Sequence, residues 1–144
     1  MPTRISPQEA DRRMREEGYV YLDVRSIPEF DEGHPTGAYN IPLLHAGAGG
    51  MQPNPDFVAE VEKVFTDRDA KIVVGCRSGG RSLNAIQMLE RVGYTGLVDQ
   101  RAGAGGARDP FGQVTEPGWQ AAGLPWSSDA EPGRSYAELT GKRG

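Results

Sequence analysis

The sequence is poor in the residues that form disulfides and bind metal ions. Its 144 residues include one cysteine and two histidines. A single cysteine excludes an internal disulfide, and one cysteine with two isolated histidines does not support a metal site. The sequence contains neither an apolar signal core nor a membrane-length apolar run. We therefore expect a cytoplasmic protein without a metal, in which the reducing environment leaves the thiol free to react.

Positive charge is also in the minority. The chain has 16 Lys and Arg against 20 Asp and Glu, which gives a formal net charge of −4. This balance argues against a nucleic-acid partner and against a membrane surface. The glycine-rich stretch at residues 46–50 lacks the Gly-Lys-Ser or Gly-Lys-Thr of a phosphate-binding loop, and we expect a flexible loop there. A chain of this length suits one domain with a buried core.

Candidate strands and helices alternate along much of the chain. Ser6, Pro7 and Glu9 have the spacing of a capping box and predict a helix that stops at Gly18. Beyond it we expect strands at residues 19–24, 38–44, 71–75 and 94–98, and helices at residues 54–65 and 82–92. The alternation predicts an α/β fold whose parallel sheet is covered on both faces.

The one cysteine stands where a predicted strand passes into a predicted helix. The β-branched run at residues 72–74 precedes Cys76, and helical apolar spacing begins after it, at Ser82. In an open parallel sheet, ligands bind at the carboxyl ends of the strands. A helix that starts there presents unpaired N–H groups and the positive end of its dipole, which favour a thiolate over a thiol.

The residues after the cysteine suit the binding of an anion. Gly79 and Gly80 allow several backbone N–H groups to converge on one point. Arg77 and Arg81 add positive charges whose planar guanidinium groups match oxyanions. The alternatives are an inert buried cysteine and a solvated helix start.

Two segments resemble the rhodanese (sulfurtransferase) domain family. One is the cysteine loop CRSGGR at residues 76–81, with four residues between the cysteine and the last arginine. The other comprises DVRSIPEF at residues 23–30 and GHPTGAYNIP at residues 33–42, which resemble the D-V-R-x-x-x-E-F and G-H-I-P-G-A-x-N-I-P segments of the family. The sequence departs from that pattern at Pro35 and Thr36. The resemblance implies an open, mainly parallel five-stranded sheet with helices on both faces.

The resemblance also implies roles for individual residues. Cys76 would carry a sulfane sulfur as a persulfide, and no other cofactor is expected. The loop residues that would bind the donor and hold the persulfide are Arg77, Ser78, Gly79, Gly80, Arg81 and Ser82. Structural support is expected from Asp23, Arg25, Glu29 and His34. Within that group, we expect Asp23 to accept hydrogen bonds from the loop and Arg25 to pair with Glu29. We interpret His34 as structural, because sulfur transfer from a good leaving group needs no base.

The last third of the chain departs from the regular alternation. A long Gly- and Pro-rich loop is expected at residues 100–118, and a polar tail at residues 129–144, after a single domain at residues 1–128. We hypothesise that the loop covers the cysteine pocket and selects the sulfur acceptor. The candidate contacts with the acceptor are Arg101, Arg108 or Phe111. The alternative is a surface loop of no consequence.

Three classes of function fit these observations. The first is a sulfurtransferase that moves sulfur from a small anionic donor such as thiosulfate to cyanide, a thiol or a protein acceptor. The second is a cysteine phosphatase or arsenate reductase, but those loops place five residues between cysteine and arginine, whereas four separate Cys76 from Arg81. The third is a module that carries sulfur or binds a partner without turnover of its own.

Overall fold

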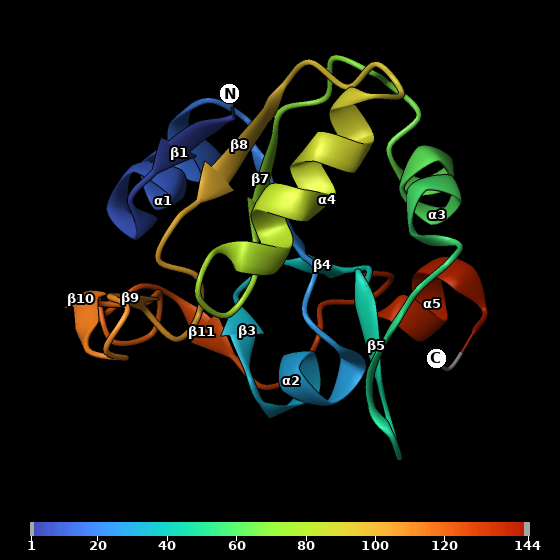
Figure 1. Cartoon of the computed structure of the whole chain (residues 1–144). Helices are drawn as coiled ribbons and strands as arrows, with labels where there is room; N and C mark the ends of the chain where they lie inside the picture. Colours follow the sequence, from blue (N-terminus) through green and yellow to red (C-terminus); the bar gives the residue numbers. More distant parts are fainter. Residues whose placement is uncertain (1, 143–144) are drawn as a thin grey trace.

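A five-stranded, all-parallel sheet forms the centre of the computed structural model, which describes residues 2–142 (Figure 1). The strands lie in the order β1-β8-β7-β2-β4, and each neighbouring pair is parallel. Their bounds are β1 (Thr3–Ile5), β2 (Val20–Asp23), β4 (Tyr39–Asn40), β7 (Ile72–Gly75) and β8 (Leu97–Gln100). The predicted sheet is confirmed.

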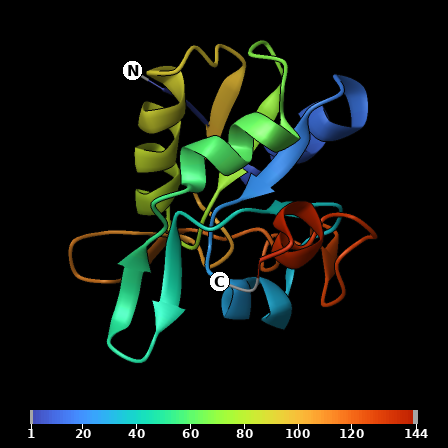
Figure 2. The same cartoon turned by 90° about the vertical axis from the view of Figure 1, so that its right-hand side faces the viewer.

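Helices cover both faces of this sheet (Figures 1 and 2). Helix α1 (Pro7–Glu16) packs on one face, while α3 (Phe57–Val64), α4 (Gly80–Glu90) and α5 (Tyr136–Thr140) pack on the other. Helix α2 (Ile27–Glu32) lies beyond the carboxyl ends of the strands. Among residues 2–142 no helix has the length and apolar character needed to cross a membrane.

The central strand β7 divides the core into two clusters. Ile72 and Val74 belong to the cluster beneath α3 and α4, whereas Val73 packs into the cluster beneath α1. This is the period-two alternation of a strand buried on both faces. Cys76 continues the first series and belongs to the α4 side. The alternation therefore directs the thiol toward the helix that follows it.

The first helix begins as its sequence predicts. Ser6 is the N-cap, and its Oγ accepts a hydrogen bond from the N–H of Glu9 at 3.1 Å. Strand β1 before it was not predicted, because three residues are too few to show a period. Pairing of β1 with β8 sets Arg4 directly opposite Asp99. An arginine from the start of the chain, on the edge strand of the sheet, is thereby brought beside Asp99.

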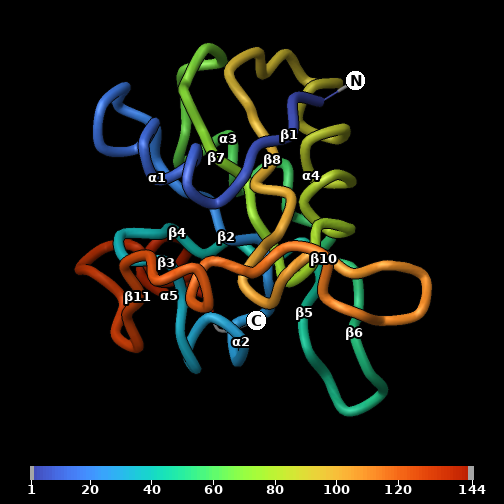
Figure 3. The backbone as a smooth tube through the Cα atoms, turned by 90° about the vertical axis from the view of Figure 1, so that its left-hand side faces the viewer, coloured from blue at the N-terminus to red at the C-terminus, as the bar shows by residue number. Residues whose placement is uncertain are grey.

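Two hairpins occupy segments that we expected to be loops (Figure 3). Strands β5 (Leu44–Gly47) and β6 (Gly50–Pro53) pair antiparallel, so the glycine-rich stretch is the turn of a hairpin. Within residues 100–118, β9 (Ala107–Arg108) pairs with β10 (Val114–Glu116), so this segment is not an irregular loop throughout. A further short pair joins β3 (His34–Pro35) to β11 (Trp126–Ser127). Backbone pairing across the turns orders both segments.

The expected polar tail is packed against the body of the protein. Tyr136 of α5 is 2 % exposed, and its hydroxyl donates to Glu60 at 2.6 Å. Lys142 donates to the same carboxylate at 2.8 Å. Arg134 donates to the carbonyl of Gly37 at 2.8 Å. The predicted polar tail is therefore docked on the domain over residues 131–142, while residues 143–144 lie outside the described residues.

We expect Tyr136→Ala to lower the free energy of unfolding by about 3 to 5 kcal/mol, because it empties an aromatic site in the core and removes one of the hydrogen-bond donors to buried Glu60. Urea unfolding followed by tryptophan fluorescence measures the change. Phe111→Ala is the matched control: this ring is 89 % exposed, and its removal should cost less than about 0.5 kcal/mol. Equal effects of the two substitutions would mean that the C-terminal segment is not docked.

Candidate active site

Cys76 lies immediately after β7, in the turn that leads into α4. The residue is 2 % exposed, and its Sγ accepts a hydrogen bond from the N–H of Gly79 at 3.1 Å. Gly79 is the N-cap of α4 and has a φ of +104°. A Cβ at this position would lie 2.8 Å from the carbonyl oxygen of Arg101. Glycine is therefore required here both for the backbone conformation and for space.

The segment after β8 fixes the cysteine turn from the other side. The N–H of Ala104 donates to the carbonyl of Cys76 at 2.8 Å, and that of Gly105 donates to the carbonyl of Arg77 at 2.7 Å. Gly103 permits this approach, because a Cβ on it would lie 2.5 Å from the backbone of Arg77. The two loop carbonyls are engaged by this segment, so the loop presents an amide and not a carbonyl to the sulfur.

Arg81 forms a two-pronged ion pair with Glu29 of α2. Nη1 lies 2.7 Å from Oε1, and Nη2 lies 3.0 Å from Oε2. Burial alone would raise the pKa of Glu29, but the hydrogen bonds and charge of Arg81 outweigh it and lower that pKa to about 2. The same pair raises the pKa of Arg81. We expected this arginine to steady the donor, but Glu29 already binds its guanidinium.

The predicted pairing of Arg25 with Glu29 is wrong. Arg25 instead donates to Asp23, with Nη2 2.7 Å from Oδ2, and to the carbonyl of Gly33 at 2.7 Å. The helical spacing does not apply, because α2 begins at Ile27 and Arg25 precedes it. Asp23 also accepts the N–H of Arg25 at 3.0 Å. Its carboxylate is thus used within its own turn, and not by the cysteine loop as we expected.

His34 contacts α2. The residue is completely buried, its Nδ1 lies 2.8 Å from the carbonyl oxygen of Phe30, and its ring stacks on that of Phe30 with the centroids 3.7 Å apart. Its polar contacts in the described chain do not include Cys76. Within residues 2–142 no group of three or more His, Cys, Asp and Glu side chains is arranged to hold a metal ion.

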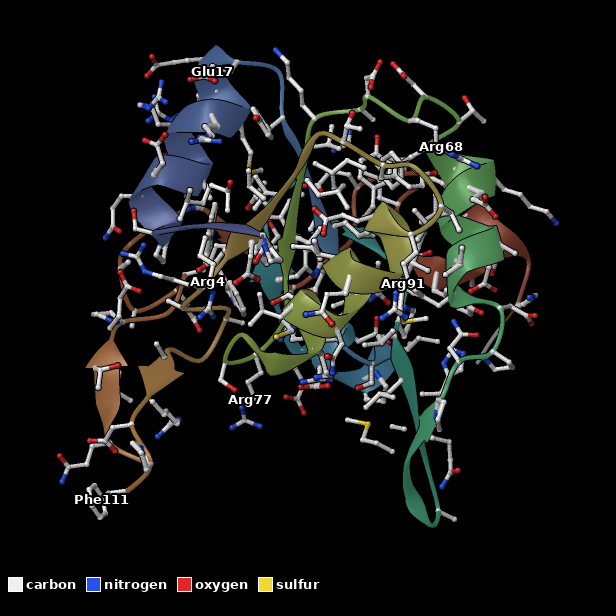
Figure 4. The ribbon with its side chains drawn as sticks, turned by 45° about the horizontal axis from the view of Figure 1, so that its top comes forward. Arg4, Glu17, Arg68, Arg77, Arg91 and Phe111 are labelled. Carbon is white, nitrogen blue, oxygen red and sulfur yellow. The ribbon has the colours of Figure 1, made fainter. Side chains whose placement is uncertain are left out.

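A pocket of about 190 Å³ opens beside the cysteine loop. Its wall includes Arg77, Arg25, Glu29, Glu32 and Ala104. Arg77 is exposed and forms no ion pair within the described part of the chain. Figure 4 shows its side chain extending away from the ribbon. Arg77 is therefore the loop cation that remains available to an incoming anion.

The three candidate acceptor contacts do not line this pocket. Arg101 is paired with Glu116 at 2.9 Å, and Arg108 donates to the carbonyl of Gly112 inside the hairpin at 2.8 Å. Phe111 lies at the far end of the hairpin, away from Arg77 (Figure 4). Only the start of the predicted loop, at Ala104 and Gly105, reaches the pocket. The hairpin itself does not cover it.

Two residues near the thiol were missed by sequence reasoning. Asp99 is fully buried and accepts a hydrogen bond from the hydroxyl of Ser82 at 2.5 Å. Arg4 donates to the other oxygen of Asp99 at 2.8 Å. Ser82 Oγ in turn lies 3.5 Å from the sulfur of Cys76. The available signal was a carboxylate at the end of an apolar strand, since a buried Asp is rare unless it is paired.

This geometry agrees with the comparison against known families. A family described as rhodanese-like domain matches residues 6–103. The chain belongs to the rhodanese-like domain family. The matched region contains the cysteine turn and α2, and it ends before the β9–β10 hairpin.

Individual rhodanese relatives extend the comparison. The chain is 49% identical over 82 residues to thiosulfate sulfurtransferase 16 of Arabidopsis thaliana, covering 57% of this chain and 68% of that protein. It is 40% identical over 103 residues to senescence-associated protein DIN1 of Raphanus sativus, covering 72% of this chain but only 55% of that protein. The crystal structure of Rv0390 from M. tuberculosis superposes with a TM-score of 0.68 at 27% identity, covering 88% of this chain and 98% of that one.

We expect Glu29→Gln to reduce stability at neutral pH, and by a smaller amount in acid. Because the folded pKa of Glu29 is about 2 and its ordinary value is 4.5, the ion pair stabilises the fold fully above about pH 4.5 and is lost as the pH falls toward 2. Urea unfolding at pH 7 and at about pH 3 measures the difference between the wild type and the variant. A difference that does not shrink in acid would contradict this account.

Proposed function

We propose that this protein is a sulfurtransferase that moves a sulfane sulfur from an anionic donor such as thiosulfate to a thiophilic acceptor. The observation that carries the proposal is the N–H of Gly79, which donates to Sγ of Cys76 at 3.1 Å at the start of α4. Charge on sulfur, whether thiolate or persulfide, is stabilised by such an amide and by the positive end of the helix dipole. Homology to a thiosulfate sulfurtransferase supports the same chemistry.

The reaction has two steps. The Cys76 thiolate attacks the outer sulfur of thiosulfate, the sulfur–sulfur bond of the donor breaks, and its electron pair leaves with sulfite. The cysteine is then a persulfide. In the second step cyanide, a thiol or a protein thiolate attacks the outer sulfur of the persulfide. The bond between Cys76 Sγ and the outer sulfur breaks, and its electron pair returns to Cys76.

The two loop arginines have different roles in this proposal. Arg77, exposed at the pocket, attracts and orients the oxyanion end of the donor. Arg81 neutralises Glu29, whose carboxylate would otherwise repel an anionic donor from the same pocket. Ser78 lies in the turn between Cys76 and α4, and Gly80 is the first residue of that helix.

The alternatives are less well supported. A phosphatase or arsenate reductase needs a cradle for a tetrahedral oxyanion, whereas the loop from Cys76 to Arg81 is one residue shorter and its last arginine is bound to Glu29. A non-catalytic carrier or interaction module is the second candidate, and relatives named only for a rhodanese-like domain favour it. We propose a reducing compartment such as the cytoplasm, with no nucleic-acid or membrane partner.

Which residues contact the sulfur acceptor stays a prediction. The β9–β10 hairpin begins beside the pocket wall at Gly105 and carries the exposed ring of Phe111 at its far end. Arg101, Arg108 and Phe111 could therefore contact only an acceptor large enough to extend beyond the pocket. The hypothesis that these three residues contact the acceptor therefore applies to a protein acceptor, and not to cyanide or a small thiol.

We expect incubation with thiosulfate to add the mass of one sulfur atom, and cyanide or a thiol to remove it. Intact-protein mass spectrometry measures both, with Cys76→Ser as the control that should stay unloaded. An aryl phosphate should not be hydrolysed. Phosphate release without sulfur loading would support the phosphatase, and neither activity would support the non-catalytic module.

We expect Arg81→Ala to lower kcat/KM for thiosulfate by more than about tenfold, because it leaves the Glu29 carboxylate unpaired at the pocket. The double variant with Glu29→Gln should recover part of this loss, since the repelling charge is gone. Arg91→Ala, an exposed arginine just after the other end of α4, is the control and should leave kcat/KM unchanged. No recovery in the double variant would indicate that Arg81 binds the donor directly.

A further inference from the structure

A chain of polar groups leads from Cys76 to Arg4. Ser82 of α4 and Asp99 of β8 are both fully buried, and they connect the sulfur to Arg4 of β1. The sulfur lies 3.5 Å from Ser82 Oγ, which lies 2.5 Å from Asp99 Oδ1. Arg4 also approaches the loop, since its Nη2 would lie 2.9 Å from a Cβ on Gly79. The thiosulfate chemistry described above makes no use of these groups.

The direction of these hydrogen bonds follows from counting hydrogens. The Ser82 hydroxyl has one hydrogen, and the carboxylate of Asp99 at 2.5 Å is a stronger acceptor than the carbonyl of Gly79 at 3.2 Å. Ser82 therefore donates to Asp99 and turns its lone pairs toward Cys76. In this arrangement the thiol S–H donates to Ser82, and Ser82 has no hydrogen left for a thiolate.

A thiolate at Cys76 would place a second negative charge in the buried site that holds Asp99. Asp99 lies one hydroxyl away from the sulfur, so two anions would face each other across Ser82 in a buried site. On α4 and in the loop, Arg81 is bound to Glu29, and Arg77 points to solvent.

The groups on the neighbouring strands do not balance the second negative charge that a Cys76 thiolate would add. Asp23 of β2 is bound to Arg25, and burial raises the pKa of Tyr21, which keeps its hydroxyl neutral. Arg4 of β1 forms an ion pair with Asp99, with Nε 2.8 Å from Oδ2. A proton that moves from Cys76 to Asp99, instead of leaving, keeps the charge of the buried group constant.

We propose that Ser82 and Asp99 form a proton relay for Cys76. As the S–H bond breaks, its proton passes to Ser82 Oγ, and the Ser82 hydroxyl proton passes to Asp99 Oδ1. The products are a Cys76 thiolate that accepts a hydrogen bond from Ser82, and a protonated Asp99. Ser82 contacts the reacting sulfur, while Asp99 acts through it as a positioning residue.

The relay adds a path for the thiol proton to the proposed function. The return of that proton, described next, rests on the proposed sulfur transfer. When an acceptor takes the outer sulfur of the persulfide, the electron pair of the broken bond returns to Cys76. The proton on Asp99 then returns through Ser82, which restores the thiol and the carboxylate. No proton is exchanged with solvent, and no further reactant is needed.

The relay is tested by the pH dependence of Cys76 alkylation with iodoacetamide. The rate for an ordinary thiol falls about tenfold per pH unit below its midpoint. In the wild type we expect a plateau, over which the rate changes less than about threefold across at least one pH unit, because the proton stays inside the protein. Ser82→Ala and Asp99→Asn should both remove the plateau and restore the tenfold slope.

The control is Asp67→Asn, an exposed carboxylate toward the opposite end of β7, which should keep the plateau. Ser82→Ala removes a single oxygen and decides the question alone if Asp99→Asn does not fold. A wild-type rate that falls with the ordinary slope, or a plateau that survives in Ser82→Ala, would overturn the relay. Alkylation needs no sulfur donor, so absence of thiosulfate loading would refute the proposed function and leave this test valid.

Discussion

The left-handed turn at Gly79 is the constraint on which the site depends. It directs one amide toward the Cys76 sulfur, starts α4, and leaves room for the segment that follows β8. That segment in turn binds the carbonyls of Cys76 and Arg77. A sulfur nucleophile needs donors that do not have to reorganise when charge appears on it. Here the hydrogen-bond donor is the N–H of Gly79, which belongs to the connection between strand and helix, so the fold itself holds it in place.

Charges around the thiol are arranged in two separate pairs. Glu29 and Arg81 neutralise each other at the pocket, while Asp99 and Arg4 neutralise each other behind the sulfur. Each pair joins elements that are distant in the sequence. Pairing of this kind contributes little where water screens it, but loss of one partner is costly where the remaining charge is left buried and unpaired. Arg77 is left as an exposed cation in the wall of the pocket.

The alternation of strands and helices could be predicted from the sequence because it is written in local patterns. The β-branched run before Cys76 and the apolar spacing after it placed the cysteine at the carboxyl end of a strand. The glycine-rich stretch at 46–50 and the segment at 100–118 were read as loops, because their order comes from antiparallel pairing across a turn and not from composition. The C-terminal segment was read as a tail, because its one strong anchor, Tyr136, is a single aromatic residue in a polar stretch.

The sequence by itself determined that a lone cysteine would lie between a buried strand and a helix, with glycines and arginines beside it, because each of these features is local in the chain. Only the tertiary structure decided which charges meet. Glu29 pairs with Arg81 of α4 and not with Arg25, which is nearer in the sequence. The strand order β1-β8-β7 brings Arg4 and Asp99 together near the thiol. Ion pairs form between groups that the sheet order makes neighbours, and sheet order is set by the packing of the whole chain.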